Sequence, residues 1–244
     1  MITIEPIALL QDNYAYLVRR GKRAVVIDPS EATTVYARVR AQELKLEAVL
    51  NTHHHWDHVG GNSDLAARFQ CGVVAAEHDR ARIAAFTQGV QDGQSIEIAG
   101  MQWEVLAVPG HTLGAIAWYL PEARAVFTGD TLFVLGCGRM FEGTPAQMWQ
   151  SLERLASLPG ETRIYCGHEY AAANARFALS LGADNGALKT RKLGTPSVPA
   201  PLEIERTTNP FLRIADPEFR RACGLSADPV EAFAELRRRK DTFS

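Results

Sequence analysis

Four side chains that commonly bind metal ions fall within six consecutive positions of the segment Thr52–Asn62, THHHWDHVGGN. They are His53, His55, Asp57 and His58. The segment follows the apolar run Ala48–Leu50, so it begins where an expected strand ends, and ligands of open α/β sheets bind at such ends. Alternate residues of an extended chain point the same way, which lets the first two grip one ion while the other two turn toward a second. Imidazole and carboxylate ligands suit zinc, iron or manganese.

A lone histidine would more often belong to a solvated polar loop. Here four of the seven histidines of the chain lie in six residues directly after a strand-like run. This clustering favours a metal site over a solvated loop. His54 lies between the expected ligands, so the same alternation points its side chain away from the metals, in a supporting or structural role.

Three further candidate ligands follow other strand-like runs, each directly after a glycine that lets the backbone turn. They are His111 after Val105–Val108, Asp130 after Ala125–Thr128 and His168 after Arg163–Cys166. A glycine followed by histidine or aspartate is common, so each of these pairs alone is a weak signal. Together with the Thr52–Asn62 segment they make four such strand ends in one chain, which indicates a shared metal centre. Asp130 is the natural bridge between two cations, because a carboxylate has two oxygens and a negative charge.

These residues match a known pattern, HxHxDH followed by His111, Asp130 and His168, and in this the chain resembles the metallo-β-lactamase superfamily. More narrowly, it resembles the glyoxalase II family, the hydroxyacylglutathione hydrolases, over essentially its whole length. The segments that carry this resemblance fall in family order: Gln11–Val18 (QDNYAYLV), Thr52–Asn62, Gly110–Thr112 (GHT), Gly129–Thr144 (GDTLF..GCGRMFEGT), Tyr165–Tyr170 (YCGHEY), Asn209–Phe211 (NPF) and Arg237–Asp241 (RRRKD).

The resemblance implies an α/β fold, an αββα sandwich followed by a small helical domain. We expect a metal-binding domain over residues 1–169 and a helical substrate-binding domain over residues 170–244. It also implies two divalent ions per chain, zinc first, with iron or manganese as alternatives. The first ion would take His53, His55 and His111, and the second Asp57, His58 and His168, with Asp130 bridging.

The activity implied is hydrolysis of S-(2-hydroxyacyl)glutathione, such as S-D-lactoylglutathione, to glutathione and D-lactate in the second step of methylglyoxal detoxification. Two cations roughly 3.5–4 Å apart can hold a hydroxide that attacks the thioester carbonyl. The leaving thiolate has a conjugate thiol with a pKa of about 8.5, so it can depart without a strong general acid. Asp57 would orient the nucleophile, and Asp57 and Asp130 are the expected catalytic carboxylates.

The expected substrate contacts are Arg139, Tyr170, Arg237 and Lys240. Alone, the basic run at the end of the last expected helix indicates only a favourable cation–helix interaction. Arg237 and Lys240 are three residues apart and share a helix face, and by resemblance they reach the glycyl carboxylate of glutathione. The family often has lysine at position 139 and tyrosine at position 141; Phe141 cannot donate a hydrogen bond, which puts one polar contact to glutathione in question.

Bulk properties fit an ordinary globular enzyme. The chain has 244 residues, 46% hydrophobic and 22% charged, with a formal net charge of −2. This charge gives no basic field for nucleic acid or anionic lipid. The N-terminus lacks a signal-peptide pattern, no apolar run approaches the roughly 18 residues of a membrane span, and the four cysteines are scattered. We therefore expect a cytoplasmic monomer with reduced thiols, acting on a small-molecule thioester, with neither nucleic acid nor membrane as partner.

Apolar runs alternate with helical patterns up to residue 169. The expected strands are Tyr14–Val18, Ala24–Ile27, Ala48–Asn51, Val73–Ala75, Trp103–Val108, Ile116–Leu120, Ala125–Thr128 and Arg163–Cys166. The expected helices are Glu31–Gln42, Asn62–Phe69, Pro145–Leu158, with a capping box at Thr144 and Gln147, and Asp228–Arg239. Beyond residue 170 we expect no strand, and Gly194–Pro201 is a proline-rich loop. Asp28 either orients a ligand histidine or forms a turn, and His78 lies at the surface.

Three other functions remain open from the residues. A β-lactamase or phosphodiesterase could use the same scaffold, but the C-terminal domain and the basic cluster argue against them. A sulfur dioxygenase would use one iron, whereas Asp57, His58 and His168 supply a second site. A closed structural site needs about four ligands, whereas seven ligands over two ions leave room for water.

Overall fold

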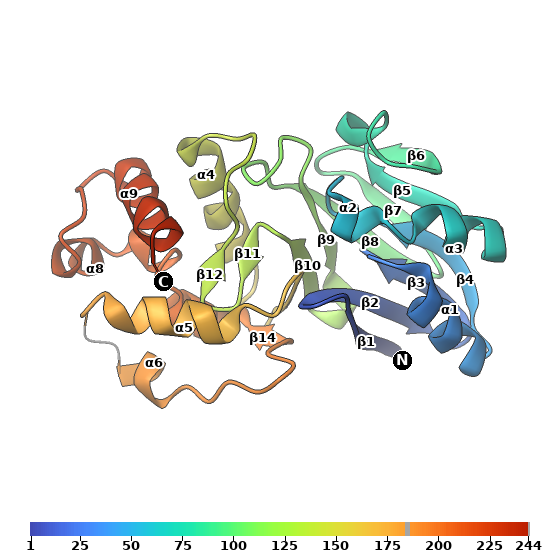
Figure 1. Cartoon of the computed structure of the whole chain (residues 1–244), viewed down its shortest axis with the longest axis horizontal. Coiled ribbons are helices and arrows are strands. Elements are labelled where there is room, and N and C mark those ends of the chain that lie inside the picture. The colour runs from blue at the N-terminus through green and yellow to red at the C-terminus, as the bar shows by residue number, and fades with distance from the viewer. Residues whose placement is uncertain (184–185, 244) are drawn as a thin grey trace. The chain divides into compact units, whose positions relative to one another are not determined.

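The computed structural model describes residues 1–183 and 186–243. The chain divides into two compact units (Figure 1). Unit 1 comprises Met1–Ala107 and Gly114–Gly129, and unit 2 comprises Val108–Leu113 and Asp130–Ser244. Both units are therefore built from two stretches of sequence. No described helix has the length and apolar character needed to cross a membrane.

The first sheet of unit 1 holds its strands in sequence order. They are β1 (Ile2–Leu9), β2 (Asn13–Arg20), β3 (Arg23–Ile27), β4 (Lys45–Leu50), β5 (Gly72–Ala76) and β6 (Phe86–Val90). The pairs β1–β2 and β2–β3 are antiparallel, and the later pairs are parallel. Two parallel strand ends therefore carry Asp28 and the Thr52–Asn62 segment on the same edge of this sheet.

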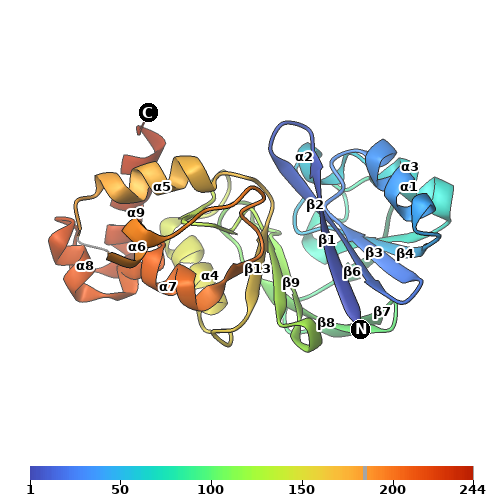
Figure 2. The same cartoon turned by 90° about the horizontal axis from the view of Figure 1, so that it is seen from below.

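Helices α1 (Ala32–Ala41) and α3 (Asn62–Phe69) cover one face of this sheet (Figure 2). The Glu31 carboxylate caps α1 by accepting hydrogen bonds from the first backbone amides of the helix. Val35 and Val39 are four residues apart, so they share a face, and they pack with Leu17 of β2 in one buried cluster. The short helix α2 (Trp56–Val59) lies within the expected metal-binding segment.

The second sheet packs against the other face. In unit 1 it comprises β7 (Ser95–Ile98), β8 (Met101–Ala107), β9 (Ile116–Leu120) and β10 (Ala125–Gly129), paired antiparallel in sequence order. The rings of Tyr16 in β2 and Phe127 in β10 have centroids 5.3 Å apart. The indole Nε1 of Trp118 donates to the backbone oxygen of Asn51 at 3.0 Å. Two sheets thus enclose the core of a sandwich, and the short 3-10 turns η1 (Glu77–Asp79) and η2 (Pro121–Ala123) connect its strands.

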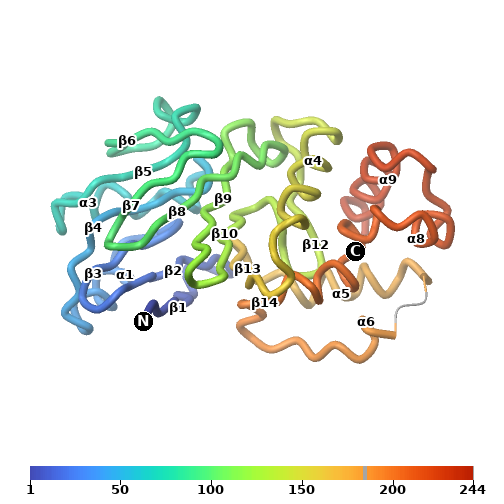
Figure 3. Tube along the Cα trace, turned by 180° about the vertical axis from the view of Figure 1, so that it is seen from behind, coloured from blue at the N-terminus to red at the C-terminus, as the bar shows by residue number. Residues whose placement is uncertain are grey.

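Unit 2 is mainly helical (Figure 3). Its short strands form two antiparallel pairs, β11 (Leu132–Phe133) with β12 (Gly136–Cys137), and β13 (Arg163–Cys166) with β14 (Ala200–Pro201). Its helices are α4 (Pro145–Ala156), α5 (Ala171–Ser180), α6 (Gly186–Thr190), α7 (Leu202–Thr208), η3 (Arg213–Ala215), α8 (Pro217–Ala222) and α9 (Pro229–Asp241). The capping box predicted for α4 is confirmed: the Thr144 amide donates to Gln147 Oε1 at 2.9 Å, and the Gln147 amide donates to Thr144 Oγ1 at 3.3 Å.

The expectation that no strand follows residue 170 is wrong. Ala200 pairs with Ile164 in the two-residue strand β14, inside the segment expected to be a loop. Two residues, one of them Pro201, are too few to show an alternating pattern, and a proline is tolerated on a short edge strand. The strand β1 was also absent from the expected set; it contains Pro6, and it pairs with β2 alone at the edge of its sheet.

Candidate active site

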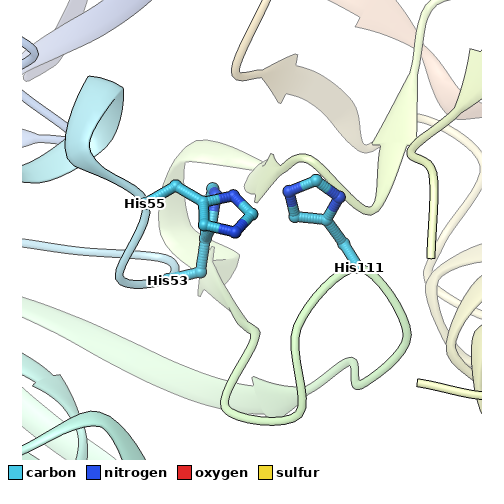
Figure 4. A group of neighbouring side chains, drawn as sticks. All are labelled: His53, His55 and His111. Atoms are coloured by element: carbon cyan, nitrogen blue, oxygen red, sulfur yellow. The ribbon is translucent and has the colours of Figure 1, made fainter. Parts of the chain in front are cut away.

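The loop that follows β4 buries two of the expected ligands of unit 1. His53 is 2% exposed and His58 is 1% exposed. His53 Nε2 lies 3.2 Å from His55 Nδ1, so these two imidazoles converge as the alternation predicts. Figure 4 shows both rings on this loop, and it shows His111 on the loop that follows β8.

Asp28 lies where β3 ends and fixes the loop that follows β4. Its carboxylate accepts hydrogen bonds from the Thr52 amide at 2.8 Å and the Thr52 hydroxyl at 2.5 Å. The same carboxylate lies 3.1 Å from His58 Nδ1. A carboxylate on one imidazole nitrogen sets the ring orientation and leaves the other nitrogen for a metal. Of the two roles left open for Asp28, the structure therefore supports the orienting one.

Asp57 is fixed by two residues that the sequence reasoning did not single out. Asn13 Nδ2 donates to the backbone oxygen of Asp57 at 3.0 Å and to its Oδ2 at 3.1 Å. The Ser30 hydroxyl donates to the same backbone oxygen at 2.5 Å. Asn13 is only 5% exposed at the start of β2, and its place directly before the apolar run Tyr14–Val18 was the available signal in the sequence.

His54 has a partner outside the cluster of loop histidines, although its ring also meets that of His55 edge-on with centroids 5.0 Å apart. Its Nδ1 lies 3.3 Å from Oδ2 of the fully buried Asp79. A Cβ atom at Gly114 would lie 2.4 Å from Asp79 Oδ1, so this close approach requires glycine. The side chain of His78 is 53% exposed, which confirms its surface position.

Unit 2 brings together its own three candidate ligands. Asp130 Oδ2 lies 3.6 Å from His111 Nε2 and 3.3 Å from His168 Nε2. His111 Nδ1 donates to the backbone oxygen of Arg139 at 2.8 Å, which turns Nε2 toward the carboxylate. A Cβ atom at Gly138 would lie 1.8 Å from the backbone oxygen of Asp130, so only glycine lets this loop pass so close. One oxygen of Asp130 therefore lies close to both imidazoles, and the bridging role stays a prediction.

Aromatic rings support this triad. Tyr170 stacks on His168 with ring centroids 4.8 Å apart and planes 3° apart. The Tyr170 ring also meets the edge of Phe133 at 5.3 Å, and Tyr170 is 37% exposed. Phe141 is 65% exposed and meets the His111 ring edge-on at 5.2 Å. Both exposed rings thus flank metal-ligand candidates.

A pocket of about 470 Å³ in unit 2 contains both candidate ligands and cations. Its lining includes His111 and Asp130, the expected substrate contacts Arg139, Tyr170, Arg237 and Lys240, and Phe133, Cys137, Gly138, Phe141, Ala173, Asn174 and Phe243. The expected substrate residues therefore share one cavity with two of the expected metal ligands.

The pocket is electropositive. Burial lowers the pKa of Lys240, and the positive charges of Arg237, Arg176 and Arg139 lower it further, against the opposing effect of Asp241. Neighbouring cations that disfavour a further charge are the same arrangement that attracts an anionic ligand.

Arg237 differs from Lys240 in its contacts within the protein. It is only 5% exposed, and its guanidinium donates to the backbone oxygen of Cys137 at 2.8 Å and to Asp241 Oδ1 at 2.9 Å. Asp241 also pairs with Arg139 Nε at 3.4 Å. Much of the hydrogen-bonding capacity of Arg237 therefore serves the protein itself.

Family comparisons agree with this arrangement. Residues 10–168 match the family described as the metallo-beta-lactamase superfamily, and residues 169–243 match the hydroxyacylglutathione hydrolase C-terminus. The chain is 47% identical to the hydroxyacylglutathione hydrolase of Ruegeria pomeroyi over 99% of both chains. It is also 47% identical to that of Methylococcus capsulatus, over 100% of this chain and 99% of the relative. The chain belongs to the hydroxyacylglutathione hydrolases, the glyoxalase II family.

A solved structure of TTHA1623, in a di-iron-bound form, is 30% identical to this hydroxyacylglutathione hydrolase. It superimposes with a TM-score of 0.63 over 86% of this chain and 100% of the other. The predicted fold class, a metallo-β-lactamase sandwich followed by a helical region, is thereby confirmed. The predicted domain boundary between residues 169 and 170 stays a prediction, because the two compact units have other limits.

The cysteines of this hydrolase do not supply a nucleophile near the pocket. Burial raises the pKa of the Cys137 thiol to about 11 and that of the Cys166 thiol to about 12. The thiolate is the reactive form, so both thiols are inert near neutral pH. No disulfide joins the four cysteines, as their spacing predicted.

Proposed function

We propose that this hydroxyacylglutathione hydrolase binds two divalent metal ions and converts S-(2-hydroxyacyl)glutathione, S-D-lactoylglutathione foremost, to glutathione and the 2-hydroxy acid. The proposed ligands are His53, His55 and His111 for one ion, Asp57, His58 and His168 for the other, and Asp130 for both. Zinc is the first candidate, and iron the second in view of the di-iron form of TTHA1623. A cytoplasmic location and a monomeric state are parts of the same proposal.

The donor set fits divalent metals in both units. His111 has one nitrogen fixed by a backbone carbonyl, and His58 has one beside the Asp28 carboxylate. Such outer partners hold the second nitrogen of each ring ready for a metal. The mixture of imidazole and carboxylate without thiolate suits zinc, iron or manganese. Cys137 lines the pocket as a thiol of raised pKa, which does not favour it as a ligand.

One observation carries the choice of substrate. The pocket of unit 2 holds two proposed metal ligands together with Arg139, Arg237 and Lys240. A glutathione thioester needs this combination, because its reacting carbonyl must reach the metals while its carboxylates need cations. A phosphodiester, or a β-lactam with its single carboxylate, carries one negative charge, whereas the glutathione moiety carries two carboxylates, so three cations in one pocket favour the thioester.

The chain's own groups have defined tasks in the reaction. Asp57, held by Asn13 and Ser30, is placed to orient a water. Asp130 would hold the His111 and His168 rings in place relative to each other. Bound divalent ions supply a water of lowered pKa and polarise the thioester carbonyl. The leaving group is a thiolate of a thiol with pKa about 8.5, so no side chain has to protonate it.

The decisive experiment is hydrolysis of S-D-lactoylglutathione by protein of measured metal content. Protein stripped with a chelator should be inactive, and reconstitution should restore turnover as the metal content approaches two ions per chain. Parallel assays with a β-lactam, a phosphodiester and a glutathione persulfide, the last with oxygen uptake, separate the rivals. Faster turnover of any of these than of the thioester would refute the proposed function.

A further inference from the structure

The hairpin β11–β12 forms one wall of the substrate pocket and follows Asp130 almost directly. Phe133 and Cys137, one in each strand, line the pocket. Each strand has only two residues, and Leu135 between them adopts a positive φ of 59°. An isolated two-stranded hairpin is marginally stable at best, and positive φ is costly for a leucine. Contacts from elsewhere in the fold must therefore hold this wall.

Three side chains from the C-terminal helical segment supply those contacts, and we name Asn174, Glu205 and Asn209 the hairpin clamp. Asn209 Nδ2 donates to the backbone oxygens of Phe133 and Gly136, both at 3.1 Å. Glu205 Oε2 accepts from the Leu135 amide at 2.8 Å. Asn174 Nδ2 donates to the backbone oxygen of Val134 at 3.0 Å.

The clamp is internally braced. Glu205 Oε2 also accepts from Asn209 Nδ2 at 3.1 Å, and Glu205 pairs with Arg191. Glu205 and Asn209 are both fully buried. A buried carboxylate costs desolvation that a well-packed apolar side chain would avoid, so stability alone is a weak reason for its presence. The Glu205 carboxylate does have a specific effect on geometry, because it holds the backbone amide of Leu135, the turn residue with positive φ.

The hairpin packs closely against the clamp at Gly136. A Cβ atom at Gly136 would lie 2.4 Å from Asn174 Nδ2, so only glycine lets the hairpin approach this amide. Each backbone position from 133 to 136 thus has one polar group bonded to a clamp side chain.

We infer that Glu205, with Asn209 and Asn174, is a positioning residue that holds the β11–β12 hairpin in place and so shapes the pocket wall against which the substrate binds. The inference rests on the proposed function for its effect on substrate, but not for its effect on the hairpin. None of the three acts on the reacting atoms. Glu205 and Asn209 do not line the pocket, so their effect reaches the substrate through Phe133 and Cys137, whereas Asn174 also lines the pocket itself.

The test compares Glu205→Ala with Glu205→Gln, which keeps an acceptor oxygen for the Leu135 amide. Glu203→Ala is the matched control, because Glu203 is an exposed glutamate on the same helix α7. Hydrogen–deuterium exchange of metal-loaded protein measures the hairpin directly, through peptides that cover residues 132–137. Metal content, KM and kcat for S-D-lactoylglutathione complete the set.

In Glu205→Ala, hairpin exchange should quicken about tenfold, which is the loss expected for one buried hydrogen bond. Strands β2–β5 should exchange as in the parent. KM should rise several-fold and by a larger factor than kcat falls, with metal content unchanged. Glu205→Gln should recover most of both effects, and Glu203→Ala should match the parent. A role limited to stability would instead quicken exchange throughout unit 2 without a selective change of KM.

Asn174→Ala removes the contact to Val134 and serves if Glu205→Ala does not fold; because Asn174 also lines the pocket, hairpin exchange is the deciding measurement for this variant. It should change hairpin exchange and KM in the same direction by a smaller factor. Unchanged hairpin exchange in the folded variants would overturn the inference, and so would a quickened hairpin with unaltered KM. A parent protein that hydrolyses no glutathione thioester would refute the proposed function, whereas the exchange measurement would still decide whether the clamp holds the hairpin.

Discussion

The metal-binding loops and the recognition pocket acquire their polar side chains in different ways. In the loop after β4 four of the candidate ligands lie within six residues, so one short segment brings them together. In the pocket, Arg237 reaches the backbone of Cys137 across 100 positions of sequence. A contiguous motif thus supplies four of the seven proposed metal donors, whereas tertiary contacts assemble the cations of the pocket and determine how many of them stay available to a ligand.

The difference extends to how the side chains are held. His111 donates from one ring nitrogen to a backbone carbonyl, and His58 lies beside a buried carboxylate, so each ring has a single orientation. The Lys240 ammonium instead lies 5.5 Å from the ring centroid of Phe177 and 5.7 Å from that of Phe243. Contacts of cations with aromatic faces are weaker and less directional than hydrogen bonds. Substitutions should therefore have large effects in the loops and graded effects in the pocket.

The largest effect should come from Asp130→Ala. This change removes the carboxylate that lies within 3.6 Å of two imidazoles proposed as ligands, so at least one metal ion should be lost. Turnover should fall on the order of 100-fold or more, by analogy with other losses of electrostatic stabilisation. Metal analysis and initial rates measure both. Retention of two ions with near-parental turnover would refute the bridging role.

A smaller effect is expected from Asp28→Asn, which tests whether the orienting partners matter as much as the ligands. Asparagine keeps an acceptor for the Thr52 amide but removes the charge beside His58. Loss of such an outer partner typically weakens metal affinity about 10–100-fold. Competition with a chelator measures this. Asp64→Asn, an exposed carboxylate on α3, is the control and should bind metal like the parent; equal affinities in both variants would reduce Asp28 to a turn residue.

The same contrast explains how far sequence reasoning reached. Most strands of unit 1 were predictable because their apolar runs are buried on both faces or alternate cleanly. The convergence of His53 with His55 followed from the period of an extended chain, and His54 between them turns its Nδ1 to Asp79. These features depend on a few neighbouring residues, so a local pattern contains the required information.

The remainder depends on tertiary partners that no local pattern reveals. Asn13 contacts Asp57 across 44 positions of sequence, and Asn209 contacts Phe133 across 76. Arg237 shares a helix face with Lys240 as expected, but its burial and its bonds to Cys137 and Asp241 could not be inferred from that face. Contacts between polar groups could be predicted when the groups are close in sequence and could not when they are far apart, whatever their chemical type.

Within the pocket, Lys240→Met and Arg237→Met should separate recognition from structure. Lys240→Met keeps the apolar stem and removes the charge, so KM for the glutathione thioester should rise up to about tenfold, as expected for a partly solvated charge-assisted hydrogen bond. Stability should change little. Arg237→Met should raise KM too, but it also removes the donors to Cys137 and Asp241, and should lower the free energy of unfolding by about 1–3 kcal/mol. Urea unfolding and steady-state kinetics distinguish the two.

The pH dependence sharpens this prediction. The lowered pKa of Lys240 means that its positive charge is lost at a lower pH than that of an ordinary lysine. KM should therefore rise with pH on the alkaline side, beginning below the range in which a free lysine titrates. This dependence should vanish in Lys240→Met. A thioester that lacks the glutathione tail should show neither effect, and its KM should be the same for parent and variant.

The smallest effect on metal binding should come from His54→Ala, although His54 lies between two proposed ligands. Its Nδ1 faces Asp79 rather than His53 or His55, so no donor is removed from the metal centre. Metal content should match that of the parent, and stability should fall by roughly 1 kcal/mol for the lost contact. His53→Ala and His55→Ala, measured beside it, should both lose metal, because each ring belongs to the converging pair. Equal metal loss in all three variants would mean that the loop adopts another register when metal binds, and the division between local donors and distant supports would then have to be drawn elsewhere.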